Sequence, residues 1–166
     1  MMHSTPTSRF STLFWVAVLL IGIAMEAIAL YFQYGLGYGP CVLCIHVRIY
    51  VAAFLIAALI ALATNGNKSM RILTNLTALG LSAGMAERAW QTFAVERGLV
   101  EDACGMDSGL PDWFALDKWF PTVFEPWEPC GYTPELLFGI TMAEALLALS
   151  AFAVISSLAL LLRSFR

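Results

Sequence analysis

The chain has 166 residues, of which 60% are hydrophobic and 13% are charged, whereas about 25% of the residues in an average soluble domain are charged. Together with a mean hydropathy of +0.76, this composition argues against a soluble domain and indicates a single integral membrane domain over residues 1–166. The formal net charge of −3 is small, so it gives no argument for a nucleic-acid partner.

Apolar runs are the main organising feature of the chain. A helix needs roughly 20 such residues to cross the hydrocarbon core of a bilayer. Four runs approach this length, at about residues 13–32, 41–63, 72–90 and 136–162. The third run is the weakest because Thr, Gly and Ser interrupt it. The sequence therefore predicts an all-α membrane protein with four spans.

Positively charged residues set the expected orientation of these spans. Arg9 precedes the first run, Lys68 and Arg71 lie between the second and the third, and Arg163 and Arg166 close the chain. Cytoplasmic loops of membrane proteins are enriched in Lys and Arg. Both termini of this multi-pass protein are therefore predicted to be cytoplasmic.

The end of the first run contains Ala27-Ile28-Ala29, which resembles the cleavage site of a signal peptide. The run is long for a signal peptide, however, and Glu26 stands directly before the site. We therefore expect the first span to be retained in the mature protein.

The predicted orientation places the cysteines on the outer side of the membrane, where disulfides persist. The four cysteines are Cys41, Cys44, Cys104 and Cys130. The segment Pro40-Cys41-Val42-Leu43-Cys44 opens the second run, and free N–H groups at a helix N-terminus favour thiolate over thiol. A redox pair is favoured over metal ligands or a static disulfide, because a staple across two residues constrains little of the unfolded chain.

Arg48 follows Cys44 by four residues, on the same face of the predicted helix and about 6 Å deeper along its axis. An ionisable residue inside a span is a functional hypothesis by default. Arg48 could donate a hydrogen bond to a carbonyl oxygen of a bound carrier and stabilise charge that develops there. It could also snorkel to the interface or pair with Glu26 of the first span. His46 points off this face and is interpreted as a packing or interfacial residue.

A long outer loop from about residue 91 to 135 separates the last two runs and carries Cys104 and Cys130. Aromatic residues recur between these two cysteines: Trp113, Phe114, Trp119, Phe120, Phe124 and Trp127. Such a pattern is typical of a short amphipathic segment at the membrane surface, and intervening prolines prevent one continuous helix. The alternative is a small extramembrane core that packs on the bundle.

The Cys104–Cys130 pair allows two interpretations. A disulfide there would close the loop as a structural staple, worth about 3.5 kcal/mol in the chain-entropy model. On the other hand, Gly105, Pro129 and Gly131 imply exposed backbone, and exposed disulfides tend to exchange with thiols. An exchangeable pair would give Cys41 and Cys44 a second dithiol to react with.

Three classes of function fit these features. In an oxidoreductase, a soluble dithiol would reduce Cys104–Cys130, Cys41–Cys44 would re-oxidise that loop pair, and a membrane quinone would re-oxidise Cys41–Cys44. A metal-binding membrane module is less well matched, because structural zinc favours repeated Cys-x-x-Cys pairs and the chain has one; no metal site is therefore expected. A non-catalytic scaffold with stapled loops is the third class.

Taken together, these residues resemble the DsbB family, bacterial inner-membrane proteins that re-oxidise the periplasmic thiol oxidase DsbA. The similarity covers almost the whole chain: the four runs, Glu26 in the first, Pro-Cys-Val-Leu-Cys-Ile followed by Arg48, and the cysteine-flanked loop. The segment Ala115-Leu116-Asp117-Lys118-Trp119-Phe120-Pro121 is similar to the loop of that family as well. A vitamin K epoxide reductase-like membrane oxidoreductase is the nearest alternative.

The resemblance implies a protein-dithiol:quinone oxidoreductase with a DsbA-like periplasmic partner and ubiquinone or menaquinone as acceptor. It also implies that Cys104 forms the mixed disulfide with the oxidase and that Cys130 is its loop partner. Cys41 and Cys44 would be the quinone-coupled pair, with Cys44 against the quinone ring and Arg48 close to it. The implied fold is an antiparallel four-helix transmembrane bundle with a short interfacial helix in the second periplasmic loop.

Overall fold

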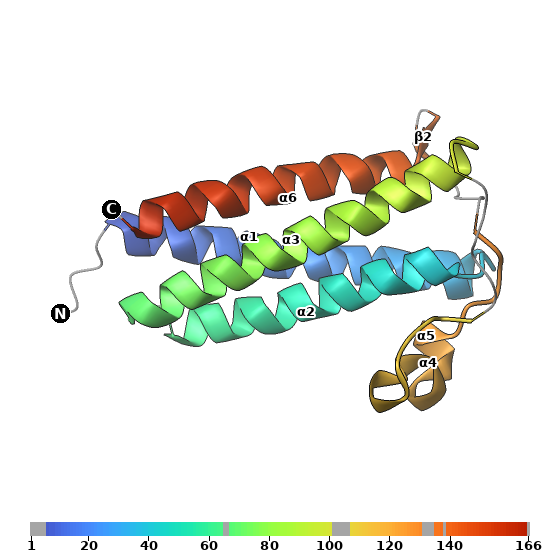
Figure 1. Ribbon diagram of the computed structural model, residues 1–166, viewed down its shortest axis with the longest axis horizontal. Coiled ribbons are helices and arrows are strands. Elements are labelled where there is room, and N and C mark those ends of the chain that lie inside the picture. The colour runs from blue at the N-terminus through green and yellow to red at the C-terminus, as the bar shows by residue number, and fades with distance from the viewer. Residues whose placement is uncertain (1–5, 65–66, 101–106, 131–134, 138, 166) are drawn as a thin grey trace.

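The computed structural model describes residues 6–64, 67–100, 107–130, 135–137 and 139–165. Within these ranges, the helices of more than 20 residues are α1 (Pro6–Leu30), α2 (Val42–Thr64), α3 (Lys68–Glu96) and α6 (Met142–Ser164). These long helices lie side by side, and α1 begins at the same end of the molecule at which α6 ends (Figure 1). α1 continues into a π-helical turn, η1 (Tyr31–Gly35).

Helices α1, α2 and α6 are long and apolar enough to cross a membrane. Within the described residues, the candidate spans are Phe10–Gly35, Val42–Thr64 and Met142–Ser164. The protein is therefore a mostly helical membrane protein, as its composition predicts. The run predicted at 72–90 lies within α3, which is not among these candidates, and its crossing of the membrane stays a prediction.

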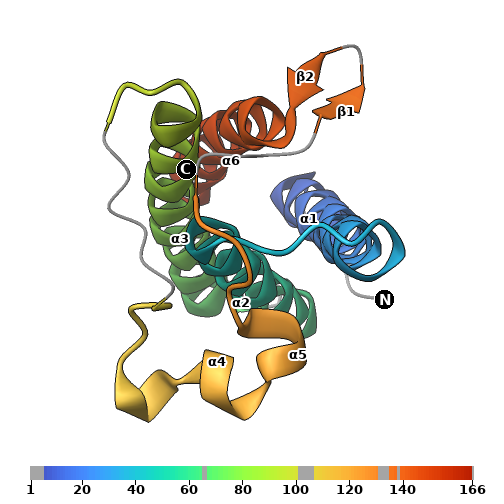
Figure 2. The same cartoon turned by 90° about the vertical axis from the view of Figure 1, so that its right-hand side faces the viewer.

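The lower hydropathy of α3 has a structural reason. This helix packs against both α2 and α6, and Figure 2 shows α2 flanked by α3 on one side and α1 on the other. Polar residues of α3 face these neighbours rather than the surroundings: Thr74, Asn75, Ser82 and Thr92 are buried. Small polar side chains allow helices to approach closely and to hydrogen-bond inside a membrane protein.

The core is built mainly from α2, with contributions from its neighbours. Trp15 of α1, Phe54 of α2 and Met85 of α3 are its large side chains, each at most 7% exposed. Fully buried small residues fill the helix contacts, among them Ala58, Ala78, Ser82, Ser150 and Ser157. This arrangement fixes the beginning of α2, and with it the Cys-x-x-Cys pair, against the rest of the bundle.

The last long helix begins later than the sequence predicts. Residues Glu135–Leu137 (β1) and Ile140–Thr141 (β2) form a small antiparallel hairpin, and α6 starts at Met142 instead of at about residue 136. A capping box sets this boundary, because the Glu144 N–H donates to Thr141 Oγ1 and the Thr141 N–H donates to Glu144 Oε2. The hydropathy pattern does not reveal this cap, because the cap consists of hydrogen bonds between side chains and backbone.

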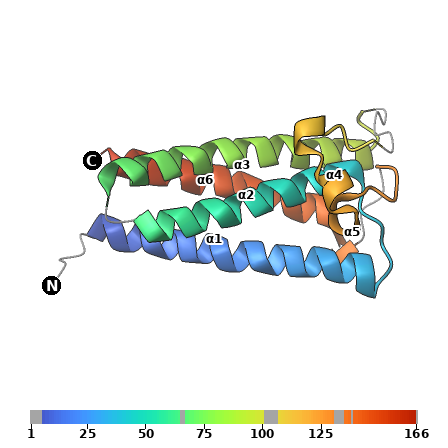
Figure 3. The ribbon, with the colours of Figure 1, turned by 90° about the horizontal axis from the view of Figure 1, so that it is seen from below.

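The loop between α3 and α6 contains short helical pieces at the end where α2 begins (Figure 3). They are a 3-10 turn, η2 (Asp112–Phe114), and two four-residue helices, α4 (Leu116–Trp119) and α5 (Pro121–Phe124). Pro121 occupies the first position of α5, where its missing N–H is not needed. The prediction that the prolines divide this segment is confirmed.

Close packing of α2 on α3 depends on Gly84. A Cβ atom at this position would lie 2.5 Å from the Tyr50 hydroxyl oxygen and 2.7 Å from ring atom Cζ. We predict that Gly84→Leu destabilises the protein by about 1–3 kcal/mol through overpacking, which would appear as a lower Tm in detergent micelles by circular dichroism. The control is Gly80→Leu on the same helix, since a Cβ at Gly80 meets no atom within 4 Å. Equal effects of the two substitutions would contradict this account.

Candidate functional site

The Cys-x-x-Cys pair stands at the N-terminus of α2. Cys41 and Cys44 form a disulfide with a Cα–Cα distance of 5.0 Å. The backbone N–H of Cys44 also donates to Cys41 Sγ at 3.2 Å. The first N–H groups of a helix have no partner within it, so this contact uses one of them. The expected position of the pair, with both sulfur atoms on one side of the first turn, is confirmed.

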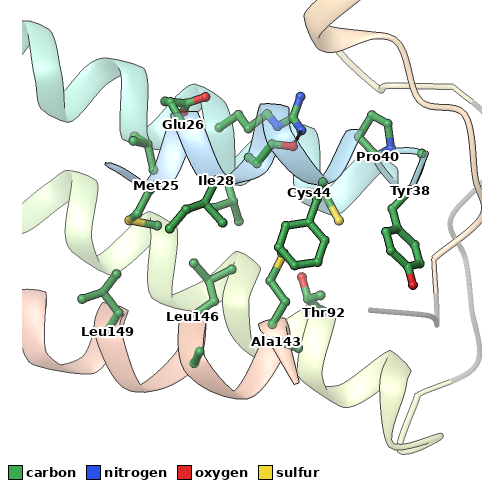
Figure 4. Close-up of a pocket in the computed structure, with 18 residues that line it drawn as sticks. Met25, Glu26, Ile28, Tyr38, Pro40, Cys44, Thr92, Ala143, Leu146 and Leu149 are labelled. Carbon is green, nitrogen blue, oxygen red and sulfur yellow. Dashed lines mark hydrogen bonds between the residues drawn. The ribbon is translucent and has the colours of Figure 1, made fainter. Parts of the chain in front are cut away.

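The two cysteines differ in exposure. Cys41 is buried, with 3% of its surface exposed, whereas Cys44 is partly exposed and lines a cavity. Figure 4 shows Cys44 on one wall of this cavity and Thr92, Ala143 and Leu146 on the facing wall. In this state of the protein, only the second cysteine of the pair borders the open space.

This cavity has a volume of about 230 Å³ and lies between α1, α2 and α6. Its lining is predominantly apolar, with Met25, Leu146 and Leu149 among its side chains (Figure 4). An apolar cavity of about 150 Å³ is large enough for benzene, so this one has room for a substituted six-membered ring. It therefore combines an apolar chamber with the reactive sulfur of Cys44.

Arg48 also lines the cavity and is 7% exposed. Its Nη1 donates to Gln33 Oε1 at 2.7 Å and to the Val123 carbonyl at 2.9 Å, and its Nη2 donates to the Ala29 carbonyl at 3.1 Å. A guanidinium has five N–H donors. Three are used in these contacts, and Nε–H and one Nη2–H have no acceptor among the described residues.

Glu26 lines the same cavity as Arg48. The sequence suggested that the two residues pair directly. However, none of the hydrogen bonds and ion pairs of Arg48 with described residues goes to Glu26. The snorkelling alternative is also not what the structure has, because Arg48 is buried among protein acceptors.

The outer loop is fastened to the bundle through the carbonyl groups of α5. Gln33, which is 2% exposed, donates from Nε2 to the Thr122 carbonyl at 3.1 Å, and the Tyr34 hydroxyl donates to the same oxygen. Arg48 donates to the neighbouring Val123 carbonyl. The last carbonyls of a helix lack partners within it, so these side chains satisfy the end of α5 and hold it against η1.

A second attachment brings the loop to the cysteine pair. The backbone N–H of Trp127 donates to the Pro40 carbonyl at 3.0 Å, directly before Cys41. Gly39 permits this approach, because a Cβ there would lie 2.8 Å from Trp127 Cβ. Cys130 follows three residues later and is disulfide-bonded. Cys104, the other predicted loop cysteine, lies outside the described residues.

His46 provides a third attachment, which the sequence analysis missed. Its Nε2–H donates to the Ser108 carbonyl at 2.8 Å, and the Ser108 hydroxyl donates to Asp117 Oδ2 at 2.8 Å. His46 is thus an anchor between α2 and the loop rather than a simple packing residue. Gln33 was missed as well. Its signal in the sequence is faint, since a single amide near the end of an apolar run does not reveal its partner.

Comparison with known proteins gives a consistent result. The family model for disulfide bond formation protein DsbB matches residues 11–160. The chain is 36% identical over 149 residues to disulfide bond formation protein B 2 of Pseudomonas aeruginosa, covering 86% of each chain. It is 36% identical over 143 residues to disulfide bond formation protein B of Shewanella loihica, covering 81% of this chain and 79% of the relative. The protein of the same name from Haemophilus influenzae is 29% identical over 162 residues, covering 89% and 84%.

The anchoring role of Gln33 can be tested. We predict that Gln33→Leu accelerates backbone hydrogen exchange in residues 121–130 by about fivefold, because the hydrogen bond from Gln33 Nε2 to the Thr122 carbonyl, worth roughly 1 kcal/mol, is lost. Exchange would be measured by mass spectrometry in detergent micelles.

The matched control for this experiment is Gln91→Leu. Gln91 bonds only to Glu87 and Arg88 of its own helix, so its loss is expected to leave exchange in residues 121–130 unchanged. Unchanged exchange in the Gln33→Leu protein would show that the loop is held by other contacts.

Proposed function

The chain belongs to the DsbB family of disulfide bond formation proteins, and we propose that it transfers electrons from a periplasmic dithiol protein to a membrane quinone. The observation that carries this proposal is the position of Cys44. Its sulfur borders an apolar cavity that opens between membrane helices, while the disulfide to which it belongs adjoins the attachment of the outer loop. A protein dithiol would react on the loop side, and a lipid-soluble acceptor would react on the cavity side.

The residues around the cavity fit a quinone headgroup. A quinone accepts two electrons and two protons, so its site needs a reductant and hydrogen-bond donors beside an apolar chamber. Cys44 supplies the reducing thiolate, and Arg48 retains two N–H donors beyond those that the described residues use. Glu26 is the ionisable group of the lining that can hold a proton in the span. Ubiquinone has one substituted six-membered ring, for which this volume has room, and menaquinone, with two fused rings, is the larger alternative.

The unequal exposure of Cys41 and Cys44 supports an assignment of which sulfur atom is attacked and which one leaves. The thiolate released from the Cys41–Cys44 disulfide should face the acceptor, and Cys44 is the one that lines the cavity. Attack is therefore expected at Cys41 Sγ, with Cys44 as the leaving group. Cys130 is the attacking residue in this scheme, because its chain is tied to Pro40 through the Trp127 N–H. Since Cys41 is 3% exposed, the Trp127–Pro40 contact must open for the reaction.

The full cycle then balances in thiols and disulfides. A DsbA-like dithiol attacks the Cys104–Cys130 disulfide and forms a mixed disulfide with Cys104; the second thiol of the partner resolves it, which leaves the partner oxidised and the loop pair reduced. Cys130 attacks Cys41 and releases Cys44. Cys104 then attacks Cys130 in the interloop bond, which restores Cys104–Cys130 and leaves Cys41 and Cys44 as the reduced pair that the acceptor re-oxidises.

We further propose that the four long helices form a transmembrane bundle in the bacterial inner membrane, with α3 as the fourth span. Basic residues near the beginning of α1, the beginning of α3 and the end of α6 support cytoplasmic termini. Aromatic side chains on the short loop helices are exposed, with Trp113 at 79%, Trp119 at 56% and Phe120 at 57%. Such exposed rings support an interfacial position for α4 and α5 at the periplasmic surface.

Two alternatives from the sequence are less well supported. The match to the DsbB family favours this assignment over a vitamin K epoxide reductase-like protein. A four-thiolate metal module would use Cys41 and Cys44 as ligands, yet these residues are joined in a disulfide.

Substitution of single cysteines separates the two half-reactions. The reduced wild-type protein, mixed anaerobically with a short-chain ubiquinone, is predicted to lose all four thiols. Cys130→Ser should still lose the thiols of Cys41 and Cys44 to quinone but should not accept electrons from a reduced DsbA-like protein. Cys44→Ser should not reduce quinone at all. Quinone reduction by Cys44→Ser at the wild-type rate, measured by ultraviolet absorbance, would refute the assigned role.

Filling the cavity should weaken quinone use without affecting dithiol exchange. We predict that Leu146→Trp raises the KM for quinone by about tenfold, because a steric change in an apolar pocket typically alters substrate binding by this factor. Exchange between the loop disulfide and the dithiol partner should be unchanged. The control is Leu158→Trp on the same helix, which is 45% exposed and does not line the cavity. If Leu146→Trp slows both half-reactions equally, the cavity is not the acceptor site.

A further inference from the structure

At the opposite end of the bundle, we propose a binding site for the headgroup of an anionic glycerophospholipid, held between α1, α3 and α6. A second cavity, of about 330 Å³, lies there and is lined by Phe10 and Ser11 of α1, Arg71 and Asn75 of α3, and Leu160, Arg163 and Ser164 of α6. This is the end where α1 and α3 begin and α6 ends, away from the cysteine pair (Figures 1 and 3). The redox proposal does not involve it.

The charge at this site is positive, and no described residue neutralises it. Arg71 forms no side-chain ion pair or hydrogen bond with any described residue, and the Arg163 guanidinium lies 4.3 Å from the centroid of the Phe10 ring. The adjoining segments 6–25, 67–86 and 145–165 contain no Asp or Glu. Two guanidinium groups at one cavity are suited to a phosphate group, which they can bind through paired hydrogen bonds.

Buried polar atoms provide the second, independent observation. Asn75 is 1% exposed and Ser11 is 2% exposed, and neither Asn75 Oδ1 nor Ser11 Oγ has a hydrogen-bond partner in the described part of the chain. Buried polar groups in proteins are normally satisfied, and an exception calls for a bound water, ion or ligand. Both residues line the cavity, so a ligand in it can supply the missing partners.

The orientation of Asn75 specifies which partner is missing. Asn75 Nδ2 donates to Ser164 Oγ at 2.7 Å, and the Ser164 hydroxyl donates onward to the Leu160 carbonyl at 2.9 Å. The Ser164 hydroxyl donates its one hydrogen to the Leu160 carbonyl, so Ser164 Oγ must accept the hydrogen bond from Asn75 Nδ2. Asn75 Oδ1 is therefore left as an acceptor. The ligand therefore presents a hydrogen-bond donor beside its phosphate. A glycerol headgroup, as in phosphatidylglycerol, has both groups.

A lipid fits this position better than a soluble anion. The neighbouring side chains Phe10, Leu162 and Phe165 are 46%, 59% and 66% exposed, which provides apolar surface for acyl chains next to the polar cavity. This end also carries the basic residues that predict a cytoplasmic location. Basic pockets between membrane helices on the cytoplasmic side bind anionic lipid headgroups.

The proposal can be tested by native mass spectrometry of the delipidated full-length protein in a neutral detergent. Dioleoylphosphatidylglycerol should bind in a 1:1 complex, and the double variant Arg71→Gln/Arg163→Gln should bind it about tenfold more weakly. The matched control is Lys68→Gln, an exposed basic residue at the same end that does not line the cavity. This variant should bind as the wild type does.

Headgroup selectivity distinguishes the possible sources of the phosphate. Phosphatidylglycerol should bind more tightly than phosphatidylethanolamine, and it should also bind more tightly than phosphatidic acid, which lacks the glycerol headgroup. Asn75→Leu should remove the preference for phosphatidylglycerol over phosphatidic acid. If the Asn75→Leu protein folds poorly, Ser11→Ala tests the same preference with a smaller change to the structure. The proposal is overturned if Lys68→Gln is as damaging as the double variant, if the lipids bind equally, or if inorganic phosphate competes fully with phosphatidylglycerol.

Discussion

The buried guanidinium of Arg48 holds together the end of this protein that carries the cysteine pair. A charge inside a membrane protein is costly unless its hydrogen bonds are satisfied. Arg48 satisfies them with Ala29 in α1, with Gln33 in η1 and with Val123 in α5. Two segments that are far apart in the sequence, the end of α1 with η1 and helix α5, are therefore fixed relative to α2. Arg48 and Cys44 line the same cavity.

This arrangement gives the two sides of one disulfide very different surroundings. The Cys41–Cys44 bond lies at a boundary, with the anchored loop on one side and an apolar cavity on the other. Because only Cys44 borders the cavity, the two sulfur atoms are not equivalent. Backbone and side-chain hydrogen bonds join the loop to the helices on its side of the disulfide.

The two ends of the bundle have opposite chemistry. The cysteine end carries the acidic residues of the long loop, whereas the other end carries arginines with no nearby Asp or Glu. Polar residues of α3 line both cavities: Thr92 lines the cavity beside Cys44, and Asn75 lines the cavity beside Arg71 and Arg163. The composition that makes α3 the least hydrophobic of the long helices thus places polar atoms at both cavities.

Residues that lie close together in the sequence were enough to predict the helices and several of the candidate site residues. The apolar runs indicated the membrane helices, Pro40 with its following cysteines indicated the reactive pair, and a lone Arg48 in a span indicated a functional position. Each of these signals depends on residues within a few positions of one another, where composition and spacing fix the physics directly. For the same reason, the start of α6 was missed: a capping box overrides the hydropathy pattern.

Tertiary structure alone decided which residues meet across the bundle. Gln33 reaches Thr122, 89 positions away, and His46 reaches Ser108, 62 positions away. The cavity beside Cys44 likewise forms between α1, α2 and α6, and the second cavity forms between α1, α3 and α6. The unequal exposure of Cys41 and Cys44 follows from the same packing. Such contacts leave no local periodicity, because a hydrogen bond between distant segments requires only one suitable side chain on each. Their partners become visible only when the helices have packed.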